Sequence, residues 1–176
     1  MKKNNTTIRA PRFIAFVASS VDGRISLTKK TLPDWTSRED WQFFQKALKK
    51  MDAVVVGRNT YKAARTRLRK RTTYVFSRHL KRVTRRGSVT FINPARVNLT
   101  DMFQSYRTVG ILGGASVYQT MLEKGMLDEL SVTIEPLLFG HGVPMFSGGK
   151  STKMLALRSG RKLNNKGTLL LHYIIL

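Results

Sequence analysis

Asp40 is the side chain in this sequence best suited to chemistry on a flat heteroaromatic ring. Phe43 and Phe44 follow it three and four residues later, so a helix would place all three on one face. A carboxylate can accept two parallel hydrogen bonds from an amidine-like edge of such a ring. An acid favoured by the positive end of a helix explains the same residue equally well. The sequence therefore indicates a ring-binding carboxylate and leaves the second interpretation open.

A pair of glycines, Gly113 and Gly114, ends a short apolar run and precedes a predicted helix. Glycine has no Cβ, so a ligand can approach the backbone closely there. The first N–H groups of the helix are unpaired and attract phosphate. The segment does not match the G-x-G-x-x-G pattern of dinucleotide-binding proteins. We expect a phosphate-bearing cofactor here, with a tight strand-to-helix turn as the alternative.

Two further turns, Gly57-Arg58 and Ser77-Arg78, each follow a predicted strand. Parallel strands end at one rim of a sheet, and ligands bind beyond that rim. An arginine fork suits a phosphate. Three anion-binding turns on one rim fit a dinucleotide, and a 2′-phosphate would favour NADPH over NADH. For either arginine taken alone, a solvated surface charge is the simpler explanation.

The elements that must position these residues alternate between strands and helices. A capping box from Thr36 to Glu39 predicts the first helix. The alternation predicts one α/β domain over 1–176, with a mixed, mostly parallel sheet and helices on both faces. Predicted strands cover 12–20, 53–56, 73–76, 88–92, 109–112, 130–135 and, at or near an edge, 168–175, and residues 24–27 form a predicted short extended segment. Predicted helices cover 36–50, a segment from about 61, 98–104 and 115–124, and 140–144 is a predicted loop.

The charge balance is strongly basic, with 32 Lys and Arg against 10 Asp and Glu and a formal net charge of +22. Residues 53–100 contain thirteen basic side chains and no acid. Such a field attracts polyanions and anionic ligands. Nucleic-acid contact and an anionic cofactor are the functional explanations, and a solvated basic surface is the alternative. We rate a nucleic-acid role as the less favoured one, because no recognition motif accompanies the charge.

Several classes of protein are excluded by composition. The sequence has no cysteine, so disulfides and thiolate chemistry are excluded. Its three histidines are far apart, which argues against a metal site. Residues 13–21 resemble a buried strand more than a signal peptide, and no segment approaches the about 20 apolar residues of a membrane span. We expect a cytoplasmic protein with a flexible basic tail over 1–11.

From about residue 13 to 146, the chain resembles the dihydrofolate reductase superfamily, which includes the reductase domain of the riboflavin-biosynthesis deaminase-reductase. Val21-Asp22 follows the first strand as in that family, and Trp35 and Asp40 keep the family's spacing. The remaining matches are the cofactor turn at 57–61, the phosphate turn at 77–78 and the Gly-Gly turn at 113–118. The resemblance implies a dihydrofolate-reductase-like fold, NADPH as cofactor and a cis peptide bond at Gly113.

The same resemblance implies a role for each matching residue. Asp40 would hold the ring, Thr133 would orient Asp40, and Trp35 would belong to the active-site loop. The implied substrate-binding residues are Ala18, Trp41, Phe44, Leu68, Arg71, Leu112 and Tyr118, with Arg71 meeting the folate glutamate. The implied cofactor-binding residues are Ala18, Ile25, Gly57, Arg58, Asn59, Thr60, Ser77, Arg78, Gly113, Gly114, Ala115, Ser116, Val117 and Tyr118.

Some segments depart from the folate branch of the superfamily. The loop between Ile25 and Trp35 lacks a Gly-rich start and carries Lys29 and Lys30, whereas 137–146 looks more like the riboflavin branch. That branch usually has an arginine early in the first helix, where this chain has Asp40 and Trp41. Asp40 therefore favours NADPH-dependent reduction of 7,8-dihydrofolate to tetrahydrofolate by hydride transfer. The alternatives are a ribosylamino-pyrimidine reductase of riboflavin synthesis and a nucleic-acid-binding protein on a reductase fold, and the sequence leaves monomer or homodimer open.

Overall fold

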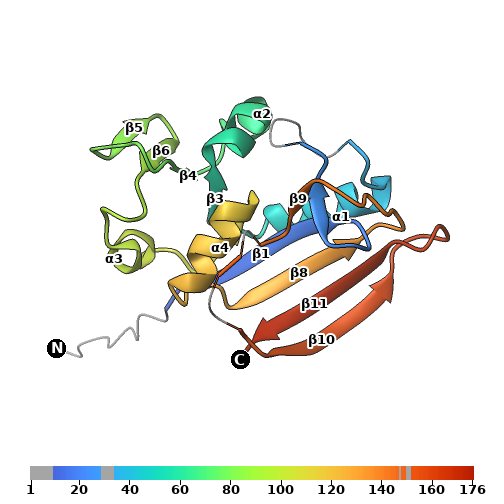
Figure 1. The fold of residues 1–176 in the computed structure, drawn as a ribbon. Helices are drawn as coiled ribbons and strands as arrows, with labels where there is room; N and C mark the ends of the chain where they lie inside the picture. Colours follow the sequence, from blue (N-terminus) through green and yellow to red (C-terminus); the bar gives the residue numbers. More distant parts are fainter. Residues whose placement is uncertain (1–9, 29–33, 147, 150–151) are drawn as a thin grey trace.

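The computed structural model describes residues 10–28, 34–146, 148–149 and 152–176 (Figure 1). The predicted basic tail up to residue 9, and Lys29 and Lys30, lie outside these described residues. The first strand begins at Arg12, where it was predicted to begin. No helix in the described part of the chain is long and apolar enough to cross a membrane.

One mixed sheet of nine strands organises the molecule, and its central strands are parallel. The strand order is β10-β11-β8-β1-β7-β3-β4-β6-β5, with antiparallel pairing only where β5, β10 and β11 join. The strands are β1 (Arg12–Ser19), β3 (Ala53–Gly57), β4 (Thr73–Phe76), β5 (Thr84–Arg86), β6 (Val89–Ile92), β7 (Thr108–Ile111), β8 (Glu129–Ile134), β10 (Leu155–Lys162) and β11 (Leu169–Ile175). A separate two-stranded sheet joins β2 (Arg24–Ser26) to β9 (Val143–Pro144).

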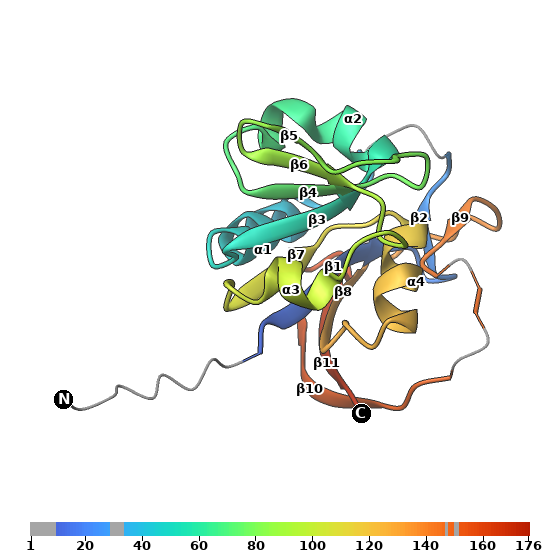
Figure 2. The ribbon, with the colours of Figure 1, turned by 90° about the vertical axis from the view of Figure 1, so that its left-hand side faces the viewer.

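Helices cover both faces of the sheet, as Figure 2 shows. Successive strand residues point to opposite faces, and Val55 and Val56 accordingly join different core clusters. Phe103 of α3 (Leu99–Phe103) and Met121 of α4 (Ala115–Glu123) pack in the cluster of Val55. Leu48 of α1 (Arg38–Leu48) and Leu68 of α2 (Arg58–Leu68) pack in the cluster of Val56. The predicted fold class is confirmed.

The predicted capping box at the start of α1 is wrong by one residue. Ser37 is the N-cap, and its side-chain oxygen accepts a hydrogen bond from the Asp40 backbone N–H at 3.3 Å. Glu39 therefore occupies the second helical position, too early to close a capping box on Thr36. Its carboxylate instead accepts a hydrogen bond of 3.2 Å from Asn164 Nδ2.

Three strands were missed by the pattern analysis. β10 forms an edge hairpin with β11, so the predicted edge strand lies second from the edge. Because β10 is exposed along nearly its whole length, it shows no alternation of apolar and polar residues. β5 and β9 have only three and two residues, and β9 falls within the predicted loop 140–144. α2 begins at Arg58, three residues earlier than expected.

Candidate active site

A cavity of about 1670 Å³ opens beyond the carboxyl ends of β1, β3, β4 and β7. This rim is where an α/β sheet of this type binds ligands. The cavity brings together predicted site residues from segments that are far apart in the chain, and of the predicted residues only Trp35 and Gly113 are absent from its lining. The predicted residues that line it are Ala18, Ile25, Asp40, Trp41, Phe44, Gly57, Arg58, Asn59, Thr60, Leu68, Arg71, Ser77, Arg78, Leu112, Gly114, Ala115, Ser116, Val117, Tyr118 and Thr133.

Asp40 is a buried carboxyl group facing the cavity from the first turn of α1, and only 8% of the residue is exposed. Burial raises the pKa of its carboxyl group, and repulsion from Glu135 raises it further. Hydrogen bonding by the side chains of Thr133 and Thr36 acts in the opposite direction and lowers this pKa. The geometry thus provides a carboxylate that a ring with N–H donors would stabilise, because such donors would replace the lost water.

Glu135 is a second buried acid at this site, and the sequence analysis missed it. The residue is 3% exposed. Its carboxylate accepts a 2.7 Å hydrogen bond from the Ser37 backbone N–H and another of 2.7 Å from Thr168 Oγ1. It therefore ties the start of α1 to the end of β8. The alternation of β8 contains the missing signal, because Thr133 and Glu135 are two residues apart and extend to the same side.

The aromatic side of the cavity lies along α1. Phe44 packs between Phe16, at 6.2 Å between ring centroids, and Trp41, at 6.0 Å. The Arg67 guanidinium lies 4.7 Å from the centre of the Trp41 ring, which is a cation–π distance. Arg71 also lines the cavity, but its Nη1 donates a 2.8 Å hydrogen bond to the Leu48 carbonyl.

Two glycine turns meet at the centre of the rim. The Gly57 N–H donates a 2.7 Å hydrogen bond to the carbonyl of Gly113, whose peptide bond to Gly114 is cis. Gly113 has φ +90°, and a Cβ there would lie 2.8 Å from the Tyr118 hydroxyl oxygen. That hydroxyl donates a 2.7 Å hydrogen bond to the Phe16 carbonyl, and burial raises the pKa of Tyr118. The turn therefore admits only glycine at position 113, and it leaves the N-terminus of α4 open to the cavity.

The turn that carries Ser77 and Arg78 is supported by a buried amide side chain, which the sequence analysis also missed. Arg58 and Arg78 are exposed on the rim, whereas Ser77 is buried at 6% exposure. Asn93 is buried, and its Nδ2 donates a 2.8 Å hydrogen bond to the carbonyl of Arg78. Asn93 thus fixes the turn that carries Ser77 and Arg78.

Trp35 lies outside the cavity lining. Its ring packs edge-on against Phe139 at 5.1 Å between centroids. The backbone N–H groups of Phe139 and Gly140 in turn donate to Asp22, at 3.1 and 2.9 Å. The structure therefore places Trp35 in the packing of the 137–146 segment, and its predicted catalytic role stays a prediction. No cluster of three or more potential metal ligands occurs within the described ranges.

Replacing Asp22 by Asn should destabilise the protein in a pH-dependent way. The Ser20 hydroxyl, which donates at 2.6 Å, and the two loop N–H groups lower the pKa of Asp22 from 3.8 to about 2. A lowered pKa in the folded state adds stability above pH 3.8, and this is lost as the pH falls toward about 2. We expect the D22N variant to melt below the wild type at neutral pH, with a gap that narrows on acidification. Thermal melts over this range measure the gap, and a gap independent of pH would contradict the assignment.

Known proteins resemble this chain in sequence and in fold. The family described as RibD C-terminal domain matches residues 11–169. The uncharacterized protein YwjB of Bacillus subtilis is 24% identical over 179 residues, covering 92% of this chain and 96% of its own. The fold matches the Thermotoga maritima diaminohydroxyphosphoribosylaminopyrimidine deaminase/5-amino-6-(5-phosphoribosylamino)uracil reductase, with a TM-score of 0.73 and 14% identity over 95% of this chain and 57% of that one.

The fold also matches a dihydrofolate reductase of Enterococcus faecalis in complex with NADP(H), with a TM-score of 0.65 and 22% identity over 93% of this chain and 96% of that one. At these identities both structures support the fold alone. The family match covers most of the chain. This chain belongs to the RibD C-terminal domain family.

Proposed function

We propose that this chain is an NADPH-dependent reductase whose substrate is a pyrimidine bearing a phosphorylated ribosylamino group. The family match supports this substrate class over dihydrofolate. The observation that carries the proposal is the buried carboxyl group of Asp40. It faces a cavity that contains two groups of basic residues, Arg58 with Arg78 and Arg38 with Arg67 and Arg71.

The residues of the rim fit a phosphorylated dinucleotide. A Cβ at Gly113 would overlap Tyr118, and a Cβ at Gly57 would lie 3.2 Å from Val117 Cγ2. Both positions are therefore suited to glycine, and no side chain covers the backbone of these two residues. The open N-terminus of α4 suits a pyrophosphate. Arg58, Ser77 and Arg78 offer two guanidinium groups and a hydroxyl to a 2′-phosphate. Bound there, reduced nicotinamide would supply the hydride.

Asp40 provides the recognition of the ring. Its carboxylate accepts hydrogen bonds from ring N–H donors, and the Thr133 side chain keeps it oriented. Phe44 lies four residues further along α1, on the same side of the helix, and its ring lines the same cavity. Orientation of this kind accelerates transfer by holding the reacting atoms in register.

Arg38 provides a phosphate contact that the sequence analysis did not recognise. It is the first residue of α1, it is exposed, and it lines the cavity two residues before Asp40. The riboflavin branch usually has an arginine early in this helix, and the position of Arg38 supports the same role for it here. Arg67 and Arg71 line the same cavity from α2 and the turn after it, and they add positive charge there.

Reduction of dihydrofolate is the second candidate. The observation that favours it is the pairing of buried Asp40 with Thr133, beside the aromatic wall of Trp41 and Phe44. A competing assay separates the two candidates: kcat/KM for NADPH oxidation with the phosphoribosylamino-pyrimidine and with 7,8-dihydrofolate, each with and without methotrexate. We expect the pyrimidine to be the better substrate. A higher kcat/KM for dihydrofolate, abolished by methotrexate, would overturn the proposal in favour of the second candidate.

Replacing Arg38 by Gln should raise KM for the phosphorylated pyrimidine by about tenfold or more, because a charge-assisted hydrogen bond contributes about 1.5–3 kcal/mol. The same variant should leave KM for the dephosphorylated substrate unchanged. Lys46→Gln is the matched control, since Lys46 is an exposed cation of the same helix that does not line the cavity. Equal effects of R38Q on both substrates would remove Arg38 from the phosphate site.

A further inference from the structure

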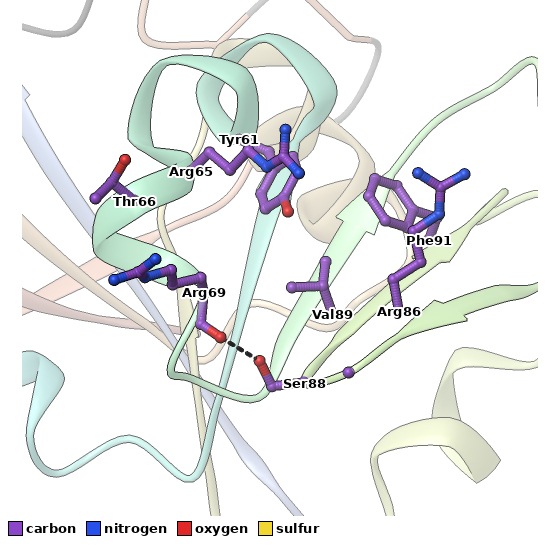
Figure 3. Close-up of a pocket in the computed structure, with 9 residues that line it drawn as sticks. Tyr61, Arg65, Thr66, Arg69, Arg86, Ser88, Val89 and Phe91 are labelled. Carbon is purple, nitrogen blue, oxygen red and sulfur yellow. Dashed lines mark hydrogen bonds between the residues drawn. The ribbon is translucent and has the colours of Figure 1, made fainter.

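A second cavity, of about 610 Å³, lies between α2 and the hairpin of β5 and β6 (Figure 3). It shares no lining residue with the cavity described above. Tyr61, Arg65 and Arg69 are spaced four residues apart, so they lie on one side of the helix, and all three line only the second cavity. The helix α2 therefore contacts the two cavities with different faces. Nothing in the proposed reductase reaction uses this second cavity.

Two arginines stand on opposite sides of this cavity. Figure 3 shows Arg65 reaching in from the helix and Arg86 from the hairpin, whereas the Arg69 side chain points away from Arg86 in this view. Both Arg65 and Arg86 are exposed. None of the ion pairs found among the described residues involves either one, and residues 53–100 contain no acid that could neutralise them. The pair is therefore available to an anionic group.

Aromatic rings and a hydrogen bond give the cavity a defined shape. Tyr61 and Phe91 pack at 90° with 5.4 Å between their centroids, so one ring presents its edge to the face of the other. Val89 beneath them is buried. Ser88 Oγ donates a 2.6 Å hydrogen bond to the Arg69 carbonyl and ties the end of α2 to the hairpin (Figure 3). Half-buried rings next to unpaired arginines provide both a stacking surface and a phosphate contact.

We propose that this cavity binds one nucleotide unit, with its phosphate between Arg65 and Arg86 and its base against Tyr61 and Phe91. The unit would come from a single-stranded nucleic acid or from a free nucleotide. The strand is favoured by the surrounding charge, because Lys62, Lys70, Arg82 and Arg85 are exposed cations close by in sequence. A basic groove with aromatic platforms is the usual arrangement of proteins that bind single strands without sequence preference.

The test is fluorescence anisotropy of a labelled deoxythymidine oligonucleotide of about twelve units, a length within the usual site size, titrated with the full chain at several salt concentrations. Arg65→Gln combined with Arg86→Gln should weaken binding at least about tenfold and reduce the slope of log K against log salt by roughly 0.7, for the one phosphate that the pair contacts. The matched control is Arg158→Gln combined with Arg161→Gln, which removes the same charge from exposed positions of β10. An equal loss in the control variant would overturn the proposal, because it would show general attraction to a basic protein.

Competition experiments identify the source of the nucleotide and the need for a base. If thymidine monophosphate displaces the labelled oligonucleotide at concentrations similar to those of the oligonucleotide itself, the cavity binds free nucleotides. If displacement needs far higher concentrations of thymidine monophosphate, the cavity binds a strand. Inorganic tripolyphosphate that competes as well as thymidine monophosphate would contradict the proposal. NADPH oxidation should be unchanged in the R65Q/R86Q variant, so a failure of this proposal is distinguishable from a failure of the reductase proposal.

Discussion

Replacing Asp40 by Asn should lower kcat at neutral pH by about a hundredfold or more, within the range expected for a group that acts on the reacting ring. The change keeps the size of the side chain but removes the charge that holds the ring. NADPH affinity should stay nearly intact, because the cofactor residues lie on other segments of the rim. Steady-state kinetics and NADPH titration of the same preparation measure the two effects.

The control for this substitution is Asp101→Asn. Asp101 also lies in the first turn of a helix, but it is exposed and does not line the cavity. Turnover of D101N should equal that of the wild type. Equal losses of turnover and NADPH affinity in D40N would undo the assignment of Asp40 to the ring.

The same D40N variant should be at least as stable as the wild type at neutral pH. Burial and repulsion from Glu135 raise the pKa of Asp40 above 3.8. Because the pKa is higher in the folded state, the protonated carboxyl group adds to the free energy of unfolding, and this contribution is complete below pH 3.8. It is lost as the pH rises through the folded-state pKa. The D40N variant lacks the buried charge, so it should melt at a higher temperature than the wild type at neutral pH. In acid the two melting temperatures should be equal. Melting curves at both ends of this range test it, and a D40N variant less stable at neutral pH would show that the ionised carboxylate is stabilising.

Replacing Gly113 by Ala should destabilise the protein and abolish tight NADPH binding. The backbone has φ +90°, where a side chain adds about 1–3 kcal/mol of strain. The new Cβ would also lie 2.8 Å from the Tyr118 hydroxyl oxygen, and Tyr118 cannot move freely because it donates to the Phe16 carbonyl. We expect a fall of roughly 3 kcal/mol or more in unfolding free energy, where each kcal/mol corresponds to about 2–4 °C in melting temperature.

Gly125→Ala separates backbone strain from crowding. Gly125 has φ +65°, but its Cβ would meet nothing within 4 Å. This variant should show only the strain, about 1 kcal/mol, with unchanged NADPH affinity. If G113A and G125A were equally stable and both bound NADPH, close packing at the Gly-Gly turn would have no part in the cofactor site.

Much of the fold could be predicted because the buried parallel strands are short apolar runs. Val54, Val55 and Val56 are 0–1% exposed, and a strand covered on both faces needs such residues. β10 could not be predicted, because an exposed edge strand has no buried face to impose a pattern. The start of α1 was misplaced because Thr36 and Ser37 are both good N-caps, and only tertiary contacts, such as the bond from Ser37 N–H to Glu135, distinguish them.

The candidate site was predictable where a turn needs a particular residue type. Gly113 is required by its positive φ and by the nearby Tyr118 ring, and Gly57 by the close approach of Val117. The topology then brings the two turns together at one rim. Glu135 and Asn93 could not be identified from the sequence, because their hydrogen-bond partners are distant along the chain. These partners are the Ser37 backbone N–H and the Arg78 carbonyl. Trp35 keeps the family's spacing to Asp40, yet its ring packs against Phe139, a contact that spacing alone does not reveal.

We propose that this chain transfers hydride from NADPH to a ring substrate held by Asp40. The most direct measurement incubates the wild-type chain with NADPH and the phosphoribosylamino-pyrimidine, follows loss of the reduced cofactor, and identifies the product by mass spectrometry. We predict one NADPH consumed for each product molecule gaining two hydrogens, with no consumption in the absence of the pyrimidine. Failure to bind NADPH, or NADPH consumption that the pyrimidine neither starts nor accelerates, would contradict it.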